Sequence, residues 1–497
     1  MNDTSEVELK SGVDPARAAA IDAALRRLGA KRVSIESRYF DSAGARLADA
    51  GLSLRLRRTG AVWEQTLKAP GASAIERHED TVRRPGRWGR EGPPPDPALH
   101  RGSAAGAALE AALGRAVDAA ALEPVCTSVV TRRRVEGESS GARIEIAFDH
   151  GTIRAGTASL PVCELEYELK SGDAGALVEF ARAAVAAHGV WLCTESKAAR
   201  GDRLARGEAA AAATASAPRL DRSMRAAEIV KAVMRACFDH VAANAGTIAN
   251  GGRDAETIHQ LRVGLRRMRT ASRELAVLSA DLPRAWEVAA ADAFRALGVW
   301  RDRETVAQSL HDRLVAAGSP QPLLSTAGDD PPDPVACVRA EGFQCALLDV
   351  LCFVLQPARG ADDDARATVD PLHEVAARLT KLQRRLKRGS GRFERLDEAA
   401  QHRVRKRLKR LRYLAELVGP LYDAAAVERY VNRLRPAQDA LGAHVDLLVG
   451  CAIAREAAGR GDAAAWFNVG WLRAQLPASA KRCRKALARA AKARAFW

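Results

Sequence analysis

The stretch "EVELKSG" at residues 6–12 decides how the N-terminal half folds, and it returns within "ELEYELKSG" at residues 164–172. Alternate side chains of an extended strand point to opposite faces. One face of the first copy therefore carries Glu6, Glu8 and Lys10, and the other face is apolar. Each copy leads into a helix with a start signal, and each helix closes on a glycine. The two copies predict two strand–helix–strand units of similar design.

Further strand-like segments of the N-terminal half repeat this division into a charged and an apolar face. On a single strand such a charged face is usually solvated. Because several segments share the pattern, we expect an antiparallel sheet that curls into a barrel or tunnel, with charge inside and helices over the apolar faces. A hairpin-like turn is expected at Asp149–Gly151. The fold class predicted for this half is an α+β antiparallel β-tunnel.

The C-terminal half reads as long Ala/Leu/Arg helices with almost no strand signal. Its "HQLRVGLRRMR", from His259, returns as "HRVRKRLKRLR", from His402, with basic residues on one helical stripe in each copy. The repeat predicts an all-α domain of two pseudo-symmetric helical bundles. The predicted domain limits are 1–205 for the tunnel, 206–220 for a linker and 221–497 for the helical domain.

Net charge and cysteine usage limit the function. The 497 residues carry a net charge of +16, and residues 221–497 hold 46 Lys and Arg against 32 Asp and Glu. This excess indicates a polyanion partner, although a solvated basic surface is the plainer interpretation. Nine cysteines without a Cys-x-x-Cys pair fit reduced thiols. With no secretory segment and no apolar run of spanning length, we expect a cytoplasmic protein with no membrane partner.

A charged tunnel interior would gather carboxylates beside Lys and Arg side chains. Carboxylate clusters suit Mg²⁺ or Mn²⁺. Lys and Arg suit an anion with several charges, and arginine can grip phosphate with two hydrogen bonds. A phosphate chain bridged by metal satisfies both sets of side chains.

The first 205 residues or so resemble the CYTH family. The resemblance rests on "EVELK", "YFD", "LRLR", "TLK", "RHE", "IEIAFDHG", "ELEYEL" and "ESKAARG", in this order. It implies a β-tunnel that hydrolyses a terminal phosphoryl group, with inorganic triphosphate as the substrate and Mg²⁺ or Mn²⁺ as the cofactor. One departure is Thr81, where the family often has an acidic residue. Its effect on metal binding or substrate preference is left open.

The resemblance also implies roles for individual residues of the tunnel. Catalytic residues would be Glu6, Glu8 and Lys10. Metal ligands would be Glu6, Glu8, Asp149, Glu164, Glu166 and Glu168. Triphosphate would be held by Lys10, Arg55, Arg57, Lys68, Arg77, Arg132, Arg134, Lys197 and Arg200.

Residues 221–497 resemble the CHAD family through "HQLRVGLRRMR", "WRDRE", "HRVRKRLKRLRYLAE" and "QDALGAHVD". The resemblance implies that the helical half binds inorganic polyphosphate in a basic groove, which the basic tail at 481–497 would extend. It leaves open an association with polyphosphate granules. Polyphosphate would be held by His259, Arg262, Arg266, Arg269, His402, Arg405, Lys406, Lys409 and Arg412.

Other functions compete with this hypothesis. Nucleic acid is the alternative polyanion, because counterion release favours any basic groove. Aromatic residues are only 5% of the chain, and no helix-turn-helix or RNP-like strand is recognisable, which argues against base readout. A non-catalytic polyphosphate-binding or granule-targeting protein, and a CYTH enzyme acting on a nucleoside or thiamine triphosphate, also stay open. The acidic cluster favours catalysis, since a pure phosphate binder gains nothing from nearby carboxylates.

Overall fold

The computed structural model describes residues 4–71, 73, 75–114, 122–320, 322, 332–357 and 370–497, apart from the side chains of residues 4–5, 299–305 and 307–308. The chain divides into two compact units. Two segments of the predicted helical half belong to the first unit, so the units are not continuous in sequence. The predicted domain limits at 205 and 221 stay predictions. The first unit is Met1–Ala213, Val241–Arg253 and Val338–Gln356, and the second is Thr214–His240, Asp254–Cys337 and Pro357–Trp497.

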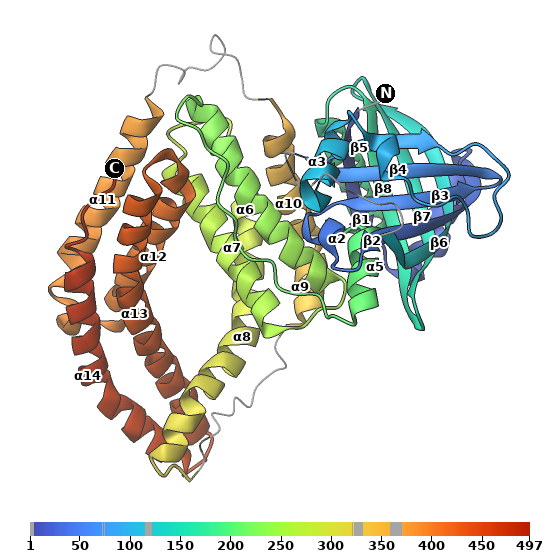
Figure 1. Cartoon of the computed structure of the whole chain (residues 1–497). Coiled ribbons are helices and arrows are strands. Elements are labelled where there is room, and N and C mark those ends of the chain that lie inside the picture. Colours follow the sequence, from blue (N-terminus) through green and yellow to red (C-terminus); the bar gives the residue numbers. More distant parts are fainter. Residues whose placement is uncertain are drawn as a thin grey trace. The chain divides into compact units, whose positions relative to one another are not determined.

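Eight strands of the first unit close into an antiparallel barrel (Figure 1). The strands are β1 (Thr4–Gly12), β2 (Lys31–Ser42), β3 (Ser53–Thr59), β4 (Val62–Pro70), β5 (Glu76–Arg83), β6 (Leu122–Ser139), β7 (Ala142–Ala155), β8 (Ala158–Ser171) and the short β9 (Trp191–Leu192). Neighbours follow the order β5-β4-β3-β2-β6-β7-β8-β1, and β5 pairs with β1 to complete the barrel. β9 pairs with the end of β1. The predicted antiparallel tunnel is confirmed.

Alternation along the strands separates the two faces as predicted. Leu9 is fully buried on the outer face of β1, whereas its neighbours Glu8 and Lys10 line the interior cavity. Outside β3 and β4, Leu54 packs in one apolar cluster with Leu109 of a covering helix. The helices of this unit are α1 (Ala18–Arg27), α2 (Arg46–Asp49), α3 (Ala104–Leu113), α4 (Gly175–His188), α5 (Lys197–Arg206) and α10 (Glu341–Leu355).

The two predicted strand–helix–strand units begin and end as their sequence signals indicate. The Asp14 side chain accepts a hydrogen bond of 3.0 Å from the Ala16 N–H before α1. The Asp173 side chain does the same for the Gly175 N–H, at 2.6 Å, before α4. α4 ends at Gly189, whose φ of 64° is the left-handed conformation that glycine adopts without a Cβ clash.

The predicted turn at Asp149–Gly151 is wrong. β7 runs through these residues without interruption, and Gly156, with a φ of 56°, makes the turn to β8. A Cβ atom on Gly151 would lie 2.1 Å from the carbonyl oxygen of Val129 on β6. Gly151 therefore permits the close approach of β6 and β7. The glycine of "DHG" is required by strand packing and does not mark a turn.

The second unit is helical throughout its described residues. Its helices are α6 (Ala226–Ala249), whose last turns belong to the first unit, α7 (Ala255–Glu274), α8 (Trp286–Ala316), α9 (Pro334–Arg339), which ends in the first unit, α11 (Pro371–Ser390), α12 (Glu398–Val418), α13 (Ala424–Gly459) and α14 (Ala465–Ala490). No described helix is both long enough and apolar enough to span a membrane. All nine cysteines are free thiols, as predicted.

The internal repeat extends to the helix caps. The Asp254 side chain accepts a hydrogen bond of 2.8 Å from the backbone of α7, and the Asp397 side chain accepts one of 2.6 Å from the backbone of α12. Each aspartate lies five residues before the first histidine of its copy, His259 or His402. The two basic stripes therefore start at the same position of two equivalent helices.

Candidate functional site

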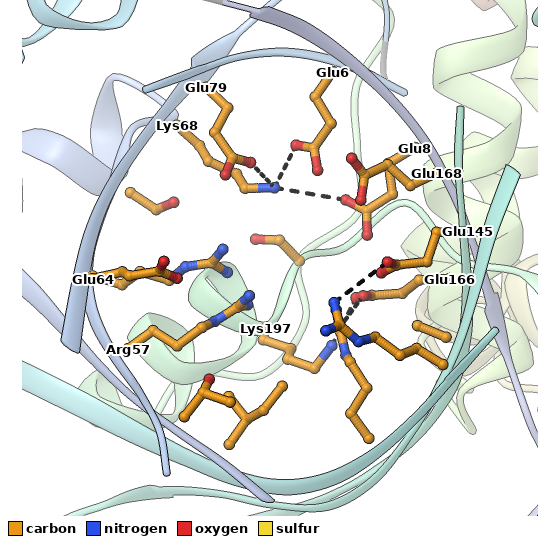
Figure 2. Close-up of a pocket in the computed structure, with 18 of the residues that line it drawn as sticks. Glu6, Glu8, Arg57, Glu64, Lys68, Glu79, Glu145, Glu166, Glu168 and Lys197 are labelled. Atoms are coloured by element: carbon orange, nitrogen blue, oxygen red, sulfur yellow. Dashed lines mark hydrogen bonds and ion pairs between the residues drawn. The ribbon is translucent and has the colours of Figure 1, made fainter. Parts of the chain in front are cut away.

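The barrel interior holds a cavity of about 560 Å³, which we call the front chamber (Figure 2). Its lining side chains come from all eight barrel strands and from the start of α5. Because every second side chain of each strand points inward, closing the barrel concentrates the charged face of each strand in one small volume. The carboxylates of the lining are Glu6, Glu8, Glu64, Glu79, Glu145, Glu166 and Glu168.

One group of carboxylates surrounds the Lys68 side chain, and we call it the Lys68 cluster: Glu6, Glu8, Glu79 and Lys68. The Lys68 ammonium pairs with Glu6, lies 2.7 Å from Glu79 Oε2 and 3.9 Å from Glu8 Oε2 (Figure 2). The Glu8 carboxylate also lies 3.1 Å from the ammonium of Lys10. Three carboxylates thus share two lysines.

The titration of Glu6 is shifted by its burial and by its neighbours in the cluster. Burial raises the pKa of Glu6 to about 8, with repulsion from Glu8 and Glu79 adding to the rise and Lys68 opposing it. At neutral pH the cluster therefore retains a proton on Glu6. A divalent cation could take the place of that proton.

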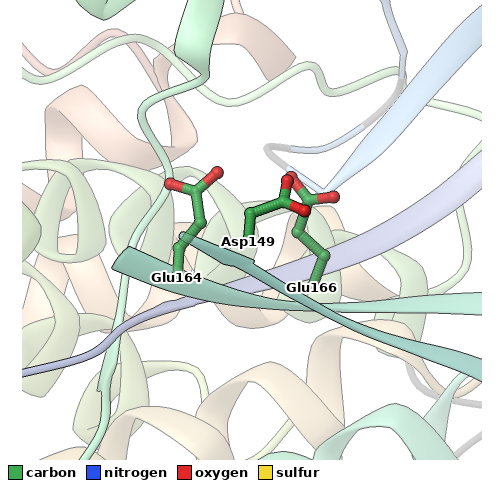
Figure 3. Close-up of side chains that lie close together, drawn as sticks. All are labelled: Asp149, Glu164 and Glu166. Atoms are coloured by element: carbon green, nitrogen blue, oxygen red, sulfur yellow. The ribbon is translucent and has the colours of Figure 1, made fainter. Parts of the chain in front are cut away.

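A second acidic group, the Asp149 cluster, consists of Asp149, Glu164 and Glu166 (Figure 3). One carboxylate oxygen of each lies within 4.8 Å of the others, and all three residues are buried. The Lys197 ammonium lies 2.7 Å from both Asp149 Oδ2 and Glu166 Oε1. Burial opposes ionisation of Asp149, but Lys197 and Arg132 hold its pKa below the usual value. This cluster is already neutralised by cations.

Arg55 and Arg57 differ from the other cations of the front chamber. Both side chains line it from β3, yet no described carboxylate makes an ion pair with either, and the Nε atom of each is buried without a hydrogen-bond partner. Burial, together with repulsion from Arg55 and Arg132, lowers the pKa of Arg57 to about 10. Against the effect of burial, Tyr39, Glu79 and Glu6 nevertheless hold the pKa of Arg55 above its usual value. Two adjacent guanidinium groups therefore face the cavity with no described carboxylate at ion-pair distance.

The structure places the predicted tunnel residues in three locations. A second cavity of about 400 Å³, the rear chamber, shares Glu8, Lys10 and Lys68 with the front chamber, and Arg77 lines it. Asp149, Glu164 and Arg200 lie behind the chamber walls, where Arg200 pairs with Glu164. The front chamber brings together Glu6, Glu8, Lys10, Arg55, Arg57, Lys68, Arg132, Arg134, Glu166, Glu168 and Lys197.

Sequence reasoning gave no role to Glu79 or Glu145, although both line the front chamber. Glu79 lies opposite Lys68 in the β4–β5 register, and Glu145 lies opposite Glu168 in the β7–β8 register. Strand alternation could have identified both residues. Glu79 lies two residues after Arg77 and Glu145 lies four residues before Asp149, so each shares a strand face with a residue that was given a role. Only the register shows which charged partner each one faces.

Thr81, the departure from the family pattern, hydrogen-bonds to a carboxylate of the Lys68 cluster. Its hydroxyl donates to Glu79 Oε1 at 2.9 Å and lies 2.9 Å from the hydroxyl of Thr66. Despite burial, Lys68 and Arg55 hold the pKa of Glu79 well below its usual value. Thr81 thus supplies a hydrogen bond to Glu79 in place of another charge.

The second unit holds a groove of about 880 Å³ between α7, α8, α12 and α13. Both copies of the predicted basic stripe contribute to it, so the repeat brings distant segments to one surface. Seven of the nine residues predicted for polyphosphate line this groove: His259, Arg262, Arg266, His402, Arg405, Lys406 and Lys409.

Positive charge in the groove is strongly crowded. Burial, and then repulsion from Arg266 and Arg405, lowers the pKa of Lys409 to about 6. Burial and the neighbouring Lys406 likewise lower the pKa of His402. The guanidinium of Arg266 lies 5.4 Å from the ring centre of Phe294, which offers a π-face and no negative charge. An anion would relieve this repulsion.

The remaining helical predictions fall outside the groove. Arg269 and Arg412 do not line it, and Arg412 pairs with Glu416 at 3.2 Å. No described residue of the basic tail lines it either, and Trp497 instead packs on Tyr430 and donates to Thr380. The predicted extension of the groove by the tail is therefore wrong. The side chains of the "WRDRE" motif at 300–304 lie outside the described residues.

The fold and the charged interior define a class of protein, in which an antiparallel tunnel with a charged lumen is joined to a helical unit with a basic groove. Residues 4–201 match the family model of the CYTH domain, and residues 232–455 match that of the CHAD domain. The chain therefore contains a CYTH domain followed by a CHAD domain.

Individual relatives were also found. An 80-residue stretch is 35% identical to the inorganic triphosphatase of Haemophilus influenzae, which is 16% of this chain and 23% of that protein, so the match spans about a quarter of the relative. The CHAD domain of the plant Ricinus communis is 26% identical over 56% of this chain and 96% of its own, with a TM-score of 0.43. A Hippeastrum protein described as having a dominant triphosphatase activity is 19% identical over 41% and 96%, with a TM-score of 0.30.

Proposed function

We propose that the tunnel hydrolyses inorganic triphosphate to diphosphate and phosphate. The observation that carries this proposal is the pair Arg55 and Arg57, whose guanidinium groups face the front chamber with no described carboxylate in a direct ion pair. Holding two like charges in a buried site is unfavourable unless an anion joins them. A linear triphosphate concentrates several negative charges in a chain short enough for the chamber. The inorganic triphosphatase relative supports the same substrate.

The carboxylates of the chamber fit a divalent cation. The Lys68 cluster has more carboxylates than ammonium groups, and burial, with added repulsion from Glu8 and Glu79, raises the pKa of Glu6. Hard oxygen ligands of this kind are those that Mg²⁺ and Mn²⁺ prefer. Bound metal would neutralise phosphate charge and supply a water with a lowered pKa. We assign its binding to Glu6 and Glu8 of β1 together with Glu166 and Glu168 of β8.

The cations of the chamber would hold and orient the substrate. Arg55 and Arg57 can each donate two hydrogen bonds to phosphate oxygens. Lys197 and Arg132 already neutralise Asp149 and Glu166, so they support the acidic wall and reach the chamber from it. The charges are fixed by strand register before substrate arrives, which is the arrangement that stabilises a phosphoryl-transfer transition state.

The test is phosphate release by the purified full chain with Mg²⁺. Inorganic triphosphate, ATP, thiamine triphosphate and long-chain polyphosphate are compared, with Glu6→Ala as the inactive variant and exposed Glu138→Ala as its matched control. We expect fast release from inorganic triphosphate in the wild type and in Glu138→Ala only. Faster phosphate release from ATP or thiamine triphosphate would identify that compound as the substrate instead. Absence of release from all four would leave a phosphate-binding protein.

We further propose that the groove of the second unit binds inorganic polyphosphate. Crowded cations from both repeats, with Lys409 the most perturbed, favour a flexible chain that carries a charge at every phosphate. Reversing Arg266 and Lys409 to glutamate should weaken polyphosphate binding and spare triphosphate hydrolysis. Equal loss of affinity for duplex DNA and polyphosphate would indicate a general polyanion groove. We expect a fluorescent fusion of the protein to be cytoplasmic and enriched at polyphosphate granules.

A further inference from the structure

Most of the positive charge of the chain lies away from the groove. Residues 371–395 and 478–497 hold 15 Lys and Arg against two Glu, which is +13 of the net +16. The two segments are α11 with the turn after it, and the second half of α14 with the tail. None of their residues lines the groove. These two segments therefore form a strongly basic part of the protein that lies outside the groove.

The two segments lie side by side and run in opposite directions. Gln383 Nε2 donates to the carbonyl of Ala493 at 2.9 Å, and Arg484 Nε donates to Glu394 at 2.8 Å. Residue numbers thus rise along one segment as they fall along the other. The pairing places the two segments next to each other, with helix axes about 10 Å apart at the usual distance between packed helices.

We call the two rows of exposed cations on these segments the outer track. Its members are Lys381, Arg384, Arg388, Arg392 and Arg395 in one row, and Lys481, Arg482, Lys485, Arg489, Lys492 and Arg494 in the other. The helical members of each row lie on one face of their helix, opposite buried leucines such as Leu382 and Leu487. Arg392, Arg395, Lys492 and Arg494 follow the ends of the two helices. From Lys381 to Arg388 the helical part of the first row is about 10 Å long. Glu394, an acidic side chain within the first segment, is already paired with Arg484.

The track lies on the outside of the second unit. α12 contacts both α7 and α11, and α13 contacts both α8 and α14. In Figure 1, α12 and α13 lie between the groove helices α7 and α8 and the track helices α11 and α14. A ligand can therefore occupy the groove and the track together only if it is long enough to pass around the helices between them.

Side chains that would suit other anionic partners are missing among the described residues of the track. None of its exposed residues is a large apolar one, whereas a membrane-binding helix inserts such residues between lipids. Of the aromatic residues in the two segments, Phe393 is buried, and Phe496 and Trp497 pack edge to face on each other, with Trp497 also on Tyr430, so they offer no stacking surface for bases. A rigid nucleic acid duplex would contact this narrow surface with only one of its two phosphate backbones. A single flexible phosphate chain can follow the exposed cations of these two segments.

We propose that the outer track is a second binding site for long-chain inorganic polyphosphate, separate from the groove. This inference rests on the proposed polyphosphate binding of the same unit and extends it to chain length. Short chains bind at the groove alone. Long chains bind at the groove and the track together, so that the second contact is intramolecular and affinity rises with chain length.

The experiment measures the affinity of the full chain for labelled polyphosphate of about 10 and of about 100 phosphates, over a range of salt concentrations. The track variant carries Arg384→Glu, Arg388→Glu, Lys485→Glu and Arg489→Glu. The matched control reverses four exposed cations of the first unit, Arg27, Arg32, Arg87 and Arg101. We expect the track variant to lose about tenfold or more in affinity for the long chain and to show a shallower salt dependence. Its affinity for the short chain should equal that of the wild type.

Three results would overturn the inference. The track variant and the control could have equal affinity for the long chain, the track variant could lose short-chain and long-chain binding equally, or it could lose only duplex DNA binding. The groove variant Arg266→Glu/Lys409→Glu keeps the two proposals distinct. If it binds short chains normally while the track variant loses long chains, the groove assignment fails and the track stands. A second track variant with glutamine at the same four positions serves if the charge reversal prevents folding.

Discussion

The Arg132 guanidinium grips the Asp149 carboxylate with two hydrogen bonds of 2.7 Å, from Nε to Oδ1 and from Nη2 to Oδ2. The two residues are direct partners in the β6–β7 register, and Asp149 is fully buried. A bidentate pair in this environment satisfies groups that water cannot reach. The acidic wall of the tunnel is therefore held in place by its own cations before any ligand binds.

This pair makes a stability prediction. Asp149→Asn should lower the free energy of unfolding by about 3 kcal/mol, because it removes one of the two carboxylates that pair with the buried guanidinium of Arg132. Urea denaturation without metal measures the change. Glu138→Gln, on the exposed part of β6, is the matched control and should have no effect. Equal stability of the two variants would mean that Glu166 alone compensates Arg132.

The raised pKa of Glu6 predicts a pH dependence. The folded protein keeps a proton on Glu6 up to about pH 8, whereas the unfolded chain loses it near its ordinary value of 4.5. Between these values the unfolded state binds fewer protons, so stability falls as pH rises, by at most about 1.4 kcal/mol per pH unit. Glu6→Gln should remove this slope from metal-free unfolding curves. A slope that survives the substitution would place the titrating group elsewhere.

Metal affinity should change with pH in the opposite sense. Because a divalent cation must displace the proton of Glu6, Mg²⁺ affinity should increase from pH 6 to 8 and level off above that value. Proton release on Mg²⁺ binding, measured by calorimetry in two buffers of different ionisation enthalpy, checks this directly. Binding without proton release at pH 7 would contradict it.

The positive charge of Arg57 should strengthen triphosphate binding and lower the stability of the protein without ligand. Burial and repulsion from Arg55 lower its pKa to about 10, so its cation is destabilised until an anion arrives. Arg57→Gln is expected to raise the melting temperature without phosphate and to weaken triphosphate binding by about tenfold. Exposed Arg87→Gln is the control. Loss of stability in Arg57→Gln would show that an existing contact already compensates the charge.

The lowered pKa of Lys409 predicts that polyphosphate binding in the groove is accompanied by proton uptake. With a pKa of about 6 it is mostly neutral at pH 7.5, and a bound phosphate chain would restore its charge. Polyphosphate affinity should therefore fall as pH rises from 6 to 8, and binding at pH 7.5 should take up a proton. Lys409→Arg, whose guanidinium stays charged, should bind with much less dependence on pH. An unchanged pH profile in Lys409→Arg would assign the dependence to another group, such as His402.

Gln344 should stabilise the tunnel unit although it lies far along the sequence. Its side chain is 1% exposed, accepts from the Leu192 N–H of β9 at 2.8 Å and donates to the Val338 carbonyl at 2.6 Å. Gln344→Ala should cost about 2 kcal/mol of unfolding free energy by leaving a buried N–H without an acceptor. The exposed Gln356→Ala is its control. Wild-type stability in Gln344→Ala would show that water replaces the amide.

The positions of many candidate site residues follow from the spacing of side chains along a single strand or helix. Strand alternation in "EVELK" and "LRLR" is a property of neighbouring residues, so it places Glu6, Glu8, Arg55 and Arg57 on inward faces before any partner strand is known. Helical spacing likewise places His259 and Arg266 on one stripe. The structure confirms that these residues line the front chamber and the groove.

Other features depended on contacts between distant segments. Gly151 gives the same local signal as a turn, but the approach of β6 sets its role. Arg77 satisfies the alternation rule and still lines the rear chamber, because position along the barrel axis depends on register. Arg200 is turned to Glu164 by the placement of α5.

By itself, the sequence determined a barrel with a charged interior, a repeated helical unit with a basic stripe, and the types of residue available to bind metal and phosphate. These depend on side-chain period and composition, which act over a few residues. Only the tertiary structure decided which carboxylates share Lys68, that Arg55 and Arg57 make no direct ion pair with a described carboxylate, and that Gln344 completes the first unit. It also gathered the charge of α11 and α14 into one outer surface. Ion pairing and burial depend on distances between segments far apart in the chain, and folding alone sets those distances.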